Sequence, residues 1–145
     1  MMNERFSLRA AVHLLLIKNG KLLLLRRFNT GWEDGKYSLI AGHVDGNETI
    51  TLAMVREAKE EAGITIDPKD LHAVHVMHRK SDKEYIDFYF IADSWDGDPH
   101  IVEPDKADDM LWVDLNDIPE NILPHIQNVI ANYQQKIFFS EFNWI

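Results

Sequence analysis

The segment of residues 42–64, GHVDGNETITLAMVREAKEEAGI, constrains this chain more than any other part of its sequence. Thr49 is a residue type that favours the N-cap of a helix, and Gly63 tolerates the left-handed backbone that often closes one. We therefore predict a helix over residues 50–62. A loop containing Gly42 and Gly46 leads into it.

Three acidic residues share one face of this predicted helix. Glu57, Glu60 and Glu61 are separated by three and four positions, and such positions are neighbours on a helix surface. Like charges at this spacing destabilise a bare helix by about a few tenths of a kcal/mol per pair. A solvated acidic face is one interpretation. A site for Mg²⁺, which prefers carboxylate oxygens, is the other.

The full spacing of the segment favours the metal-binding interpretation. Its characteristic positions are Gly42, then after five residues Glu48, after seven more Arg56 and Glu57, and finally Glu60, Glu61, Gly63 and Ile64. This pattern resembles the Nudix box, with every fixed position filled. Seven fixed residues would match by chance on the order of once in a million at ordinary usage. The resemblance implies a Nudix (MutT-like) hydrolase, an enzyme that cleaves nucleoside diphosphates linked to another moiety.

The resemblance also implies roles for the residues of the box. Glu57 and Glu61 become the primary ligands of Mg²⁺, for which Mn²⁺ can substitute, and Glu60 joins them or holds a second ion. A backbone carbonyl at the start of the box, of Ala41 or Gly42, is a further expected ligand. We interpret Arg56 as the residue that orients the glutamates, through a charge-assisted hydrogen bond to a partner such as Glu48.

Other candidates lie outside the box. By resemblance, Glu103 is an extra ligand or general base, with Asp105 behind it, although a solvated loop acid is an equal alternative. Arg26 and Arg27 end a predicted strand and suit contacts with phosphate, or simply keep the strand end soluble. Strand alternation points the two arginines to opposite faces, so we expect at most one to serve.

The substrate is defined less well than the chemistry. The resemblance to MutT-like enzymes implies a base pocket of six residues, of which Tyr89 and His125 are the candidate substrate contacts: Tyr85, Asp87, Tyr89, Trp112, Leu123 and His125. The proline that marks ADP-ribose hydrolases after the box is absent, as is the motif of coenzyme A hydrolases before it. These absences favour a nucleoside triphosphate pyrophosphohydrolase that releases a monophosphate and pyrophosphate. The alternatives are hydrolysis of another nucleoside diphosphate derivative, such as a nucleotide sugar, and a non-catalytic nucleotide-binding module.

The order of elements predicts an α/β fold. Asn19-Gly20 is a type I′ hairpin signal between two apolar stretches. Strands are expected at residues 10–18, 21–27, 37–41, 71–79, 85–92, 100–102 and 110–114, and a second helix at 124–136. Strands interleaved with two helices indicate an α/β/α sandwich. The resemblance implies the same, with a mixed sheet between the helices.

Composition bounds the class of protein. At 145 residues we expect a single domain over 1–145. The net charge of −9 discourages binding to a nucleic-acid polymer, and a small nucleotide is the expected partner. There is no long apolar stretch or signal-peptide pattern, and the chain has no cysteine, so we expect a cytoplasmic protein without membrane contact. The apolar tail, residues 138–145, packs on the core or joins two copies, giving a monomer or a homodimer.

Overall fold

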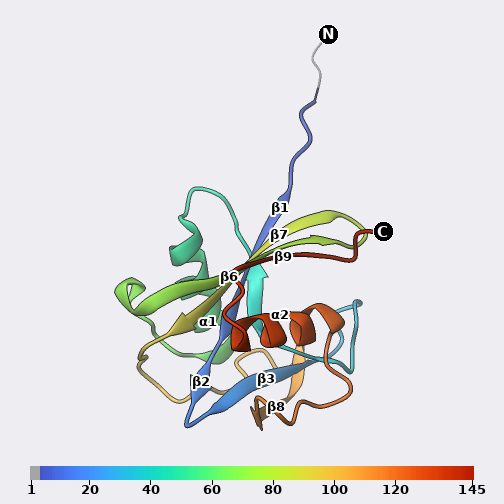
Figure 1. Cartoon of the computed structure of the whole chain (residues 1–145). Helices are drawn as coiled ribbons and strands as arrows, with labels where there is room; N and C mark the ends of the chain where they lie inside the picture. Colours follow the sequence, from blue (N-terminus) through green and yellow to red (C-terminus); the bar gives the residue numbers. More distant parts are fainter. Residues whose placement is uncertain (1–3) are drawn as a thin grey trace.

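The central layer is a five-stranded mixed sheet with one helix on each face (Figure 1). The computed structural model describes residues 4–145. Residues 1–3, at the start of the segment in which no signal-peptide pattern was found, lie outside the described residues. The strands run in the order β5 (Ile40–His43), β1 (Arg9–Leu15), β7 (Glu84–Ala92), β6 (Leu71–Lys80) and β9 (Phe139–Phe142). Two neighbouring pairs, β1 with β7 and β6 with β9, are parallel, and the others are antiparallel. The predicted α/β sandwich is confirmed.

A second, smaller sheet is built around β3 (Lys21–Arg27). Its other strands are β2 (Ile17–Lys18), β4 (Tyr37–Ser38) and β8 (Ala107–Asp114), each of which pairs with β3. The predicted strands at 10–18 and 37–41 are each divided between the two sheets. The chain changes sheet at Leu16 and Leu39, which are buried between them. A continuous apolar run in the sequence gives no signal for this change.

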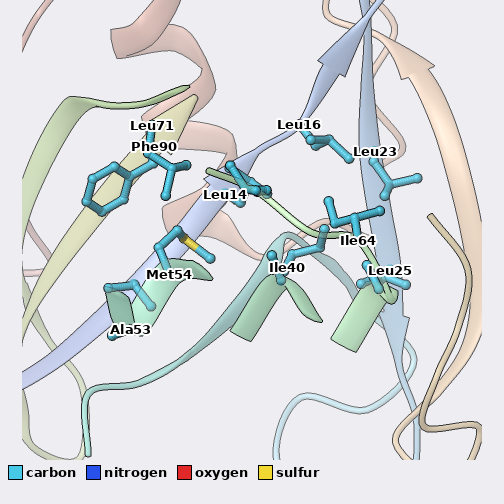
Figure 2. Close-up of a cluster of buried hydrophobic side chains, with 14 residues drawn as sticks. Leu14, Leu16, Leu23, Leu25, Ile40, Ala53, Met54, Ile64, Leu71 and Phe90 are labelled. Carbon is cyan, nitrogen blue, oxygen red and sulfur yellow. The ribbon is translucent and has the colours of Figure 1, made fainter. Parts of the chain in front are cut away.

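Helix α1 (Ile50–Ala62) has the predicted bounds and the predicted caps. Thr49 Oγ1 accepts a hydrogen bond from the Leu52 N–H at 3.1 Å, and Gly63 has a left-handed φ of 70°. The helix packs on one face of the larger sheet, where Met54 meets apolar side chains of β1 and β7 (Figure 2). Glu57 and Glu61 lie beside this buried stripe and contact β5 at the edge of the sheet.

Helix α2 (Pro124–Gln134) covers the other face of the larger sheet. Its buried apolar residues are Ile126, Val129 and Ile130, which join the core cluster that contains Leu15 and Tyr89. The helix is shorter than the predicted 124–136, and Lys136 has a positive φ of 59°. A short 3₁₀ helix, η1 (Pro68–Asp70), precedes β6. Within residues 4–145, no helix is long and apolar enough to cross a membrane.

Three segments differ from the predicted elements. Strand β8 begins at Ala107 rather than residue 110, and the apolar tail forms β9, a parallel edge strand beside β6. Residues 100–102 are not a strand. Two of their N–H groups instead form hydrogen bonds with carbonyl groups at the C-terminal end of α1. His100 donates to the Ala62 carbonyl and Val102 to the Glu61 carbonyl. This contact brings the following residue, Glu103, next to the acidic end of α1.

Candidate active site

The acidic face of α1 lies against β5, and the fit depends on the absence of a side chain at Gly42. A methyl group built on Gly42 would lie 2.0 Å from Glu57 Cδ and 2.2 Å from Glu57 Oε2. Such distances are well inside van der Waals contact. Glycine is therefore the residue that lets the Glu57 carboxylate lie directly over the strand.

Glu61 is the most deeply buried acid of this face. Its Oε1 accepts a hydrogen bond from the Ala41 N–H at 2.7 Å. Burial raises the pKa of Glu61 to about 8; the charges of Glu57 and Glu103 add to the rise, and the Ala41 hydrogen bond opposes it. Burial likewise raises the pKa of Glu57, against the lowering effect of Arg56. The site therefore holds carboxylates whose negative charge is poorly compensated by the protein.

Arg56 holds the acidic face in a fixed arrangement. Its Nε and Nη2 donate to both oxygens of Glu48, at 3.0 and 2.9 Å, which is the two-pronged geometry that guanidinium favours. Its Nη1 donates to Glu57 at 2.6 Å and to Glu60 at 3.3 Å. Hydrogen bonds from Arg56 and from the Asp45 N–H lower the pKa of Glu48 to about 2. The predicted contact between Arg56 and Glu48 is confirmed.

The donor set of this face suits a hard divalent cation. In the described part of the chain, no three acidic or histidine side chains already surround a common point at metal-binding distance. Arg56 and the Ala41 N–H hold the carboxylates instead, and each of Glu57, Glu60 and Glu61 uses one oxygen in these contacts. Carboxylate oxygens are the ligands that Mg²⁺ and Mn²⁺ prefer.

A cavity of about 440 Å³, here named the acidic pocket, opens beside Glu61. Its walls come from β3, the loop that follows β3, β4 and the segment that precedes β8. Glu103 and Asp105, which were predicted from sequence to lie near the box, line this pocket together with Glu61. Lys106 Nζ lies 3.4 Å from Glu103 Oε2. The structure thus brings an acid from outside the box to the acidic end of α1.

Arg26 and Arg27 both line the acidic pocket, and a bulge separates them in the pairing of β3 with β8. The residue skipped in this pairing is Asp108 on β8, so the bulge leaves the alternation along β3 unchanged. Their contacts differ. Arg26 Nε donates to Asp108 at 2.7 Å, whereas Arg27 donates to the Trp32 carbonyl at 2.8 Å and lies over the Trp32 ring at 4.8 Å. Arg27 is therefore held at the edge of the pocket by the loop.

A second cavity of about 380 Å³, here named the aromatic pocket, adjoins the first and shares Arg27 and Ser38 with it. Aromatic rings and imidazoles form much of its wall: His13, Trp32, His43, Tyr85 and His125. His125, predicted as a substrate contact, belongs to this wall, and burial lowers its pKa to about 3. The imidazole of His125 is therefore neutral near pH 7.

Three residues predicted for the base pocket do not line it. Asp87 is fully buried. Tyr89 is fully buried and stacks on His13 with ring centroids 4.5 Å apart, so its side chain supports the pocket from below without reaching its surface. Trp112 packs against the core cluster on the α1 face. His13 and Trp32 line the pocket but were not predicted from the sequence. The sequence signals for them are a histidine inside an aliphatic strand and a tryptophan inside a glycine-containing loop.

The NUDIX domain family matches residues 7–133. This chain belongs to the Nudix family. It is 31% identical to an ADP-ribose pyrophosphatase of Methanocaldococcus jannaschii, over 86% of this chain and 72% of the relative. It is also 31% identical to an oxidized purine nucleoside triphosphate hydrolase of Danio rerio, over 79% of this chain and 71% of the relative.

The fold agrees with this membership. The structure of a MutT Nudix hydrolase from Burkholderia pseudomallei matches with a TM-score of 0.80 at 24% identity, and the match covers 87% of this chain and 98% of that one. The protein is thus a MutT-like Nudix hydrolase, an enzyme that acts on phosphorus-containing anhydrides. The Nudix box is the segment of residues 42–64 whose helix presents the acidic face.

Replacing Gly42 with alanine is expected to lower hydrolysis while leaving the fold intact. The added methyl group meets the end of a flexible side chain, the Glu57 carboxylate, rather than backbone. The carboxylate can therefore move away, and we expect a loss of about 10- to 100-fold in kcat/KM, as for other disturbed metal-ligand supports. Steady-state kinetics and a thermal melt of the same preparation measure the two effects.

The double variant Gly42→Ala/Glu57→Gln provides the control. If Gly42 acts through Glu57, the double variant is no slower than Glu57→Gln alone, because coupled residues are not additive. Fully additive losses would show that Gly42 serves another purpose.

Proposed function

We propose that this Nudix hydrolase is a Mg²⁺-dependent nucleoside triphosphate pyrophosphohydrolase that releases a nucleoside monophosphate and pyrophosphate, with Mn²⁺ as a substitute ion. The observation that carries the proposal is the adjacency of the two pockets. They share Arg27 and Ser38, so one molecule can extend its phosphates along the acidic pocket and its base into the aromatic pocket. The relative from Danio rerio, which acts on oxidized purine nucleoside triphosphates, agrees with this substrate class.

The charges of the site explain why a cation is needed. The protein has a net charge of −9, which repels a polyphosphate, and the basic residues that line the acidic pocket only balance its three acids: Arg26, Arg27 and Lys106. Bound Mg²⁺ would neutralise phosphoryl oxygens and lower the pKa of a bound water. Glu57 and Glu61 are the proposed primary ligands, with Glu60 as a third carboxylate and the Gly42 carbonyl as a backbone ligand. Arg56 positions these groups through the hydrogen bonds described above.

Two further residues act on the substrate in this proposal. Glu103 lines the acidic pocket with Glu61, and its carboxylate accepts the proton of the attacking water or adds a ligand. Arg27 lies where the pockets meet, and its fixed guanidinium binds the phosphates nearest the base. His125 contributes a neutral, flat wall to the base pocket.

A second candidate is favoured by the relative from Methanocaldococcus jannaschii, an ADP-ribose pyrophosphatase. A nucleoside diphosphate derivative presents the same anhydride and the same base, so the two pockets would hold it in the same way. A non-catalytic nucleotide-binding module is the third candidate. The retention of Glu57, Glu60 and Glu61 argues against it, since such a module needs no metal ligands.

A substrate panel with Mg²⁺, with Mn²⁺ and with EDTA tests the proposal by product identity. We expect nucleoside triphosphates to give a monophosphate and pyrophosphate, and EDTA to stop the reaction. Preferential cleavage of ADP-ribose or a nucleotide sugar would favour the second candidate. A nucleotide that raises the melting temperature and is never consumed would favour the third. Water enriched in ¹⁸O identifies the phosphorus that is attacked.

A further inference from the structure

One polar atom of the aromatic pocket has no partner. His13 lines this pocket on β1, and 5% of its surface is exposed. Within residues 4–145, two buried side-chain nitrogens lack a hydrogen bond, His13 Nδ1 and His78 Nε2. His78 Nε2 lies 3.5 Å from a Glu84 carboxylate oxygen, so a charge is at least close to it. His13, by contrast, is one of the residues that line the aromatic pocket, so a ligand bound there is the candidate for the missing partner.

The other nitrogen of His13 determines what Nδ1 can do. His13 Nε2 lies 3.1 Å from Asp87 Oδ1, and Arg79 donates to Asp87 from Nε at 2.7 Å and from Nη2 at 3.3 Å. Burial alone would raise the pKa of Asp87, but its contacts with His13 and Arg79 lower the pKa below its ordinary value. Asp87 is therefore an ionised carboxylate, which accepts hydrogen bonds and cannot donate one. The Nε2 atom of His13 therefore carries a hydrogen, which it donates to Asp87.

Asp87 is already paired with Arg79, and both residues are buried. A neutral imidazole with its hydrogen on Nε2 has an acceptor at Nδ1. The surrounding wall is flat: His13 stacks on Tyr89, and Arg79 lies 4.4 Å from the centre of the Tyr85 ring.

We propose that His13 Nδ1 selects the base of the substrate by accepting a hydrogen bond from an N–H group on the edge of a planar heterocycle bound in the aromatic pocket. The inference rests on the proposed nucleotide substrate and adds a specificity-determining residue to it. A heterocycle whose facing edge lacks an N–H leaves this buried nitrogen without a partner, and sites built around such a bond discriminate strongly. His13 thus restricts the substrates to bases that offer a donor there.

Binding of nucleosides, which carry no phosphate and need no metal, tests this separately from hydrolysis. The probes are three pairs that differ by methylation of an N–H: inosine and 1-methylinosine, adenosine and N6,N6-dimethyladenosine, and uridine and 3-methyluridine. In ¹⁵N NMR spectra of the imidazoles, we expect an unprotonated Nδ1 of His13 in the free protein. At least one parent nucleoside shifts that resonance, and its methylated partner binds at least about tenfold more weakly.

Two variants complete the experiment. His13→Phe keeps a flat ring without the acceptor and is expected to remove the difference between parent and methylated nucleoside. His75→Gln is the matched control, because His75 is a buried histidine 5.9 Å from the same Tyr89 ring, but both its nitrogens bond to the C-terminal segment. The His75→Gln variant is expected to keep the difference in binding between the parent and the methylated nucleoside.

Three results would overturn the proposal: a proton on Nδ1 in the free protein, no parent nucleoside that perturbs His13, or discrimination that survives in His13→Phe. Should His13→Phe not fold, the spectra of the wild-type protein decide. A protein that hydrolyses no nucleotide but passes the binding test refutes the proposed function alone. One that hydrolyses nucleotides and fails the binding test refutes the role of His13 alone.

Discussion

Glu57→Gln and Glu61→Gln are each expected to lower Mg²⁺-dependent hydrolysis by more than about 100-fold. Loss of a residue that only supports a metal ligand costs up to about 100-fold, and loss of a ligand itself should cost more. Glutamine keeps the shape of the side chain but removes the negative charge that attracts a divalent cation. The loss should appear mainly in kcat at saturating metal. Release of monophosphate and pyrophosphate, measured over a range of Mg²⁺ concentrations, provides the check.

The same two substitutions should not unfold the protein. Burial raises the pKa values of both carboxyl groups, so their charged forms are unfavourable at these positions, and a neutral amide avoids that cost. We expect melting temperatures in EDTA that are equal to or above that of the wild type, as is common for residues kept for activity rather than stability. Glu120→Gln, at an exposed acid outside both pockets, is the control for a generic change of charge. Turnover like that of the wild type in both active-site variants would refute the metal assignment.

Asp87→Asn is expected to lower the free energy of unfolding by about 3–5 kcal/mol, the usual effect of removing one partner of a buried ion pair. Asp87 is fully buried and Arg79 nearly so, and the substitution leaves the guanidinium charge in the interior without its carboxylate. Such a loss is a large share of the stability of an ordinary domain. Urea unfolding at pH 7 measures it.

A surface pair of the same length provides the matched control. Arg26 and Asp108 are also 2.7 Å apart, but about a third of each side chain is exposed. Asp108→Asn should therefore cost no more than about 1 kcal/mol, because solvent screens exposed pairs. Equal losses in Asp87→Asn and Asp108→Asn would show that burial does not set the strength of the Arg79–Asp87 pair.

The pH dependence of stability follows from the same cluster. The pKa of Asp87 is lower in the folded protein than in the unfolded chain, so its contribution is complete above the unfolded value of about 4 and is lost as the pH falls further. As the pH falls, His125 lowers the stability at a higher pH than Asp87 does. Its folded pKa is about 3 and its ordinary value is 6.5, so the unfolded chain takes up a proton first and stability declines from pH 6.5 downward. The difference between wild type and Asp87→Asn should shrink below pH 4.

Helices and turns were predictable where they depend on interactions between residues close together in the sequence. Helix α1 was predicted with its exact bounds, because Thr49 and Gly63 are local capping signals. The hairpin at Asn19 was predicted because positive φ is a property of the residue types at the turn. The edge strand β9 was not predicted. Its partner in β6 is more than sixty residues away, and an apolar tail carries no mark of the strand it will join.

The sequence by itself determined the family, the acidic helix face and the pairing of Arg56 with Glu48, since all of these lie within one contiguous segment with fixed spacing. Only the tertiary structure decided that Tyr89 lies beneath the pocket, and that His13 ends with one nitrogen on Asp87 and the other unpaired. These arrangements depend on which strands become neighbours, and strand neighbours are set by the burial of the whole core rather than by local spacing.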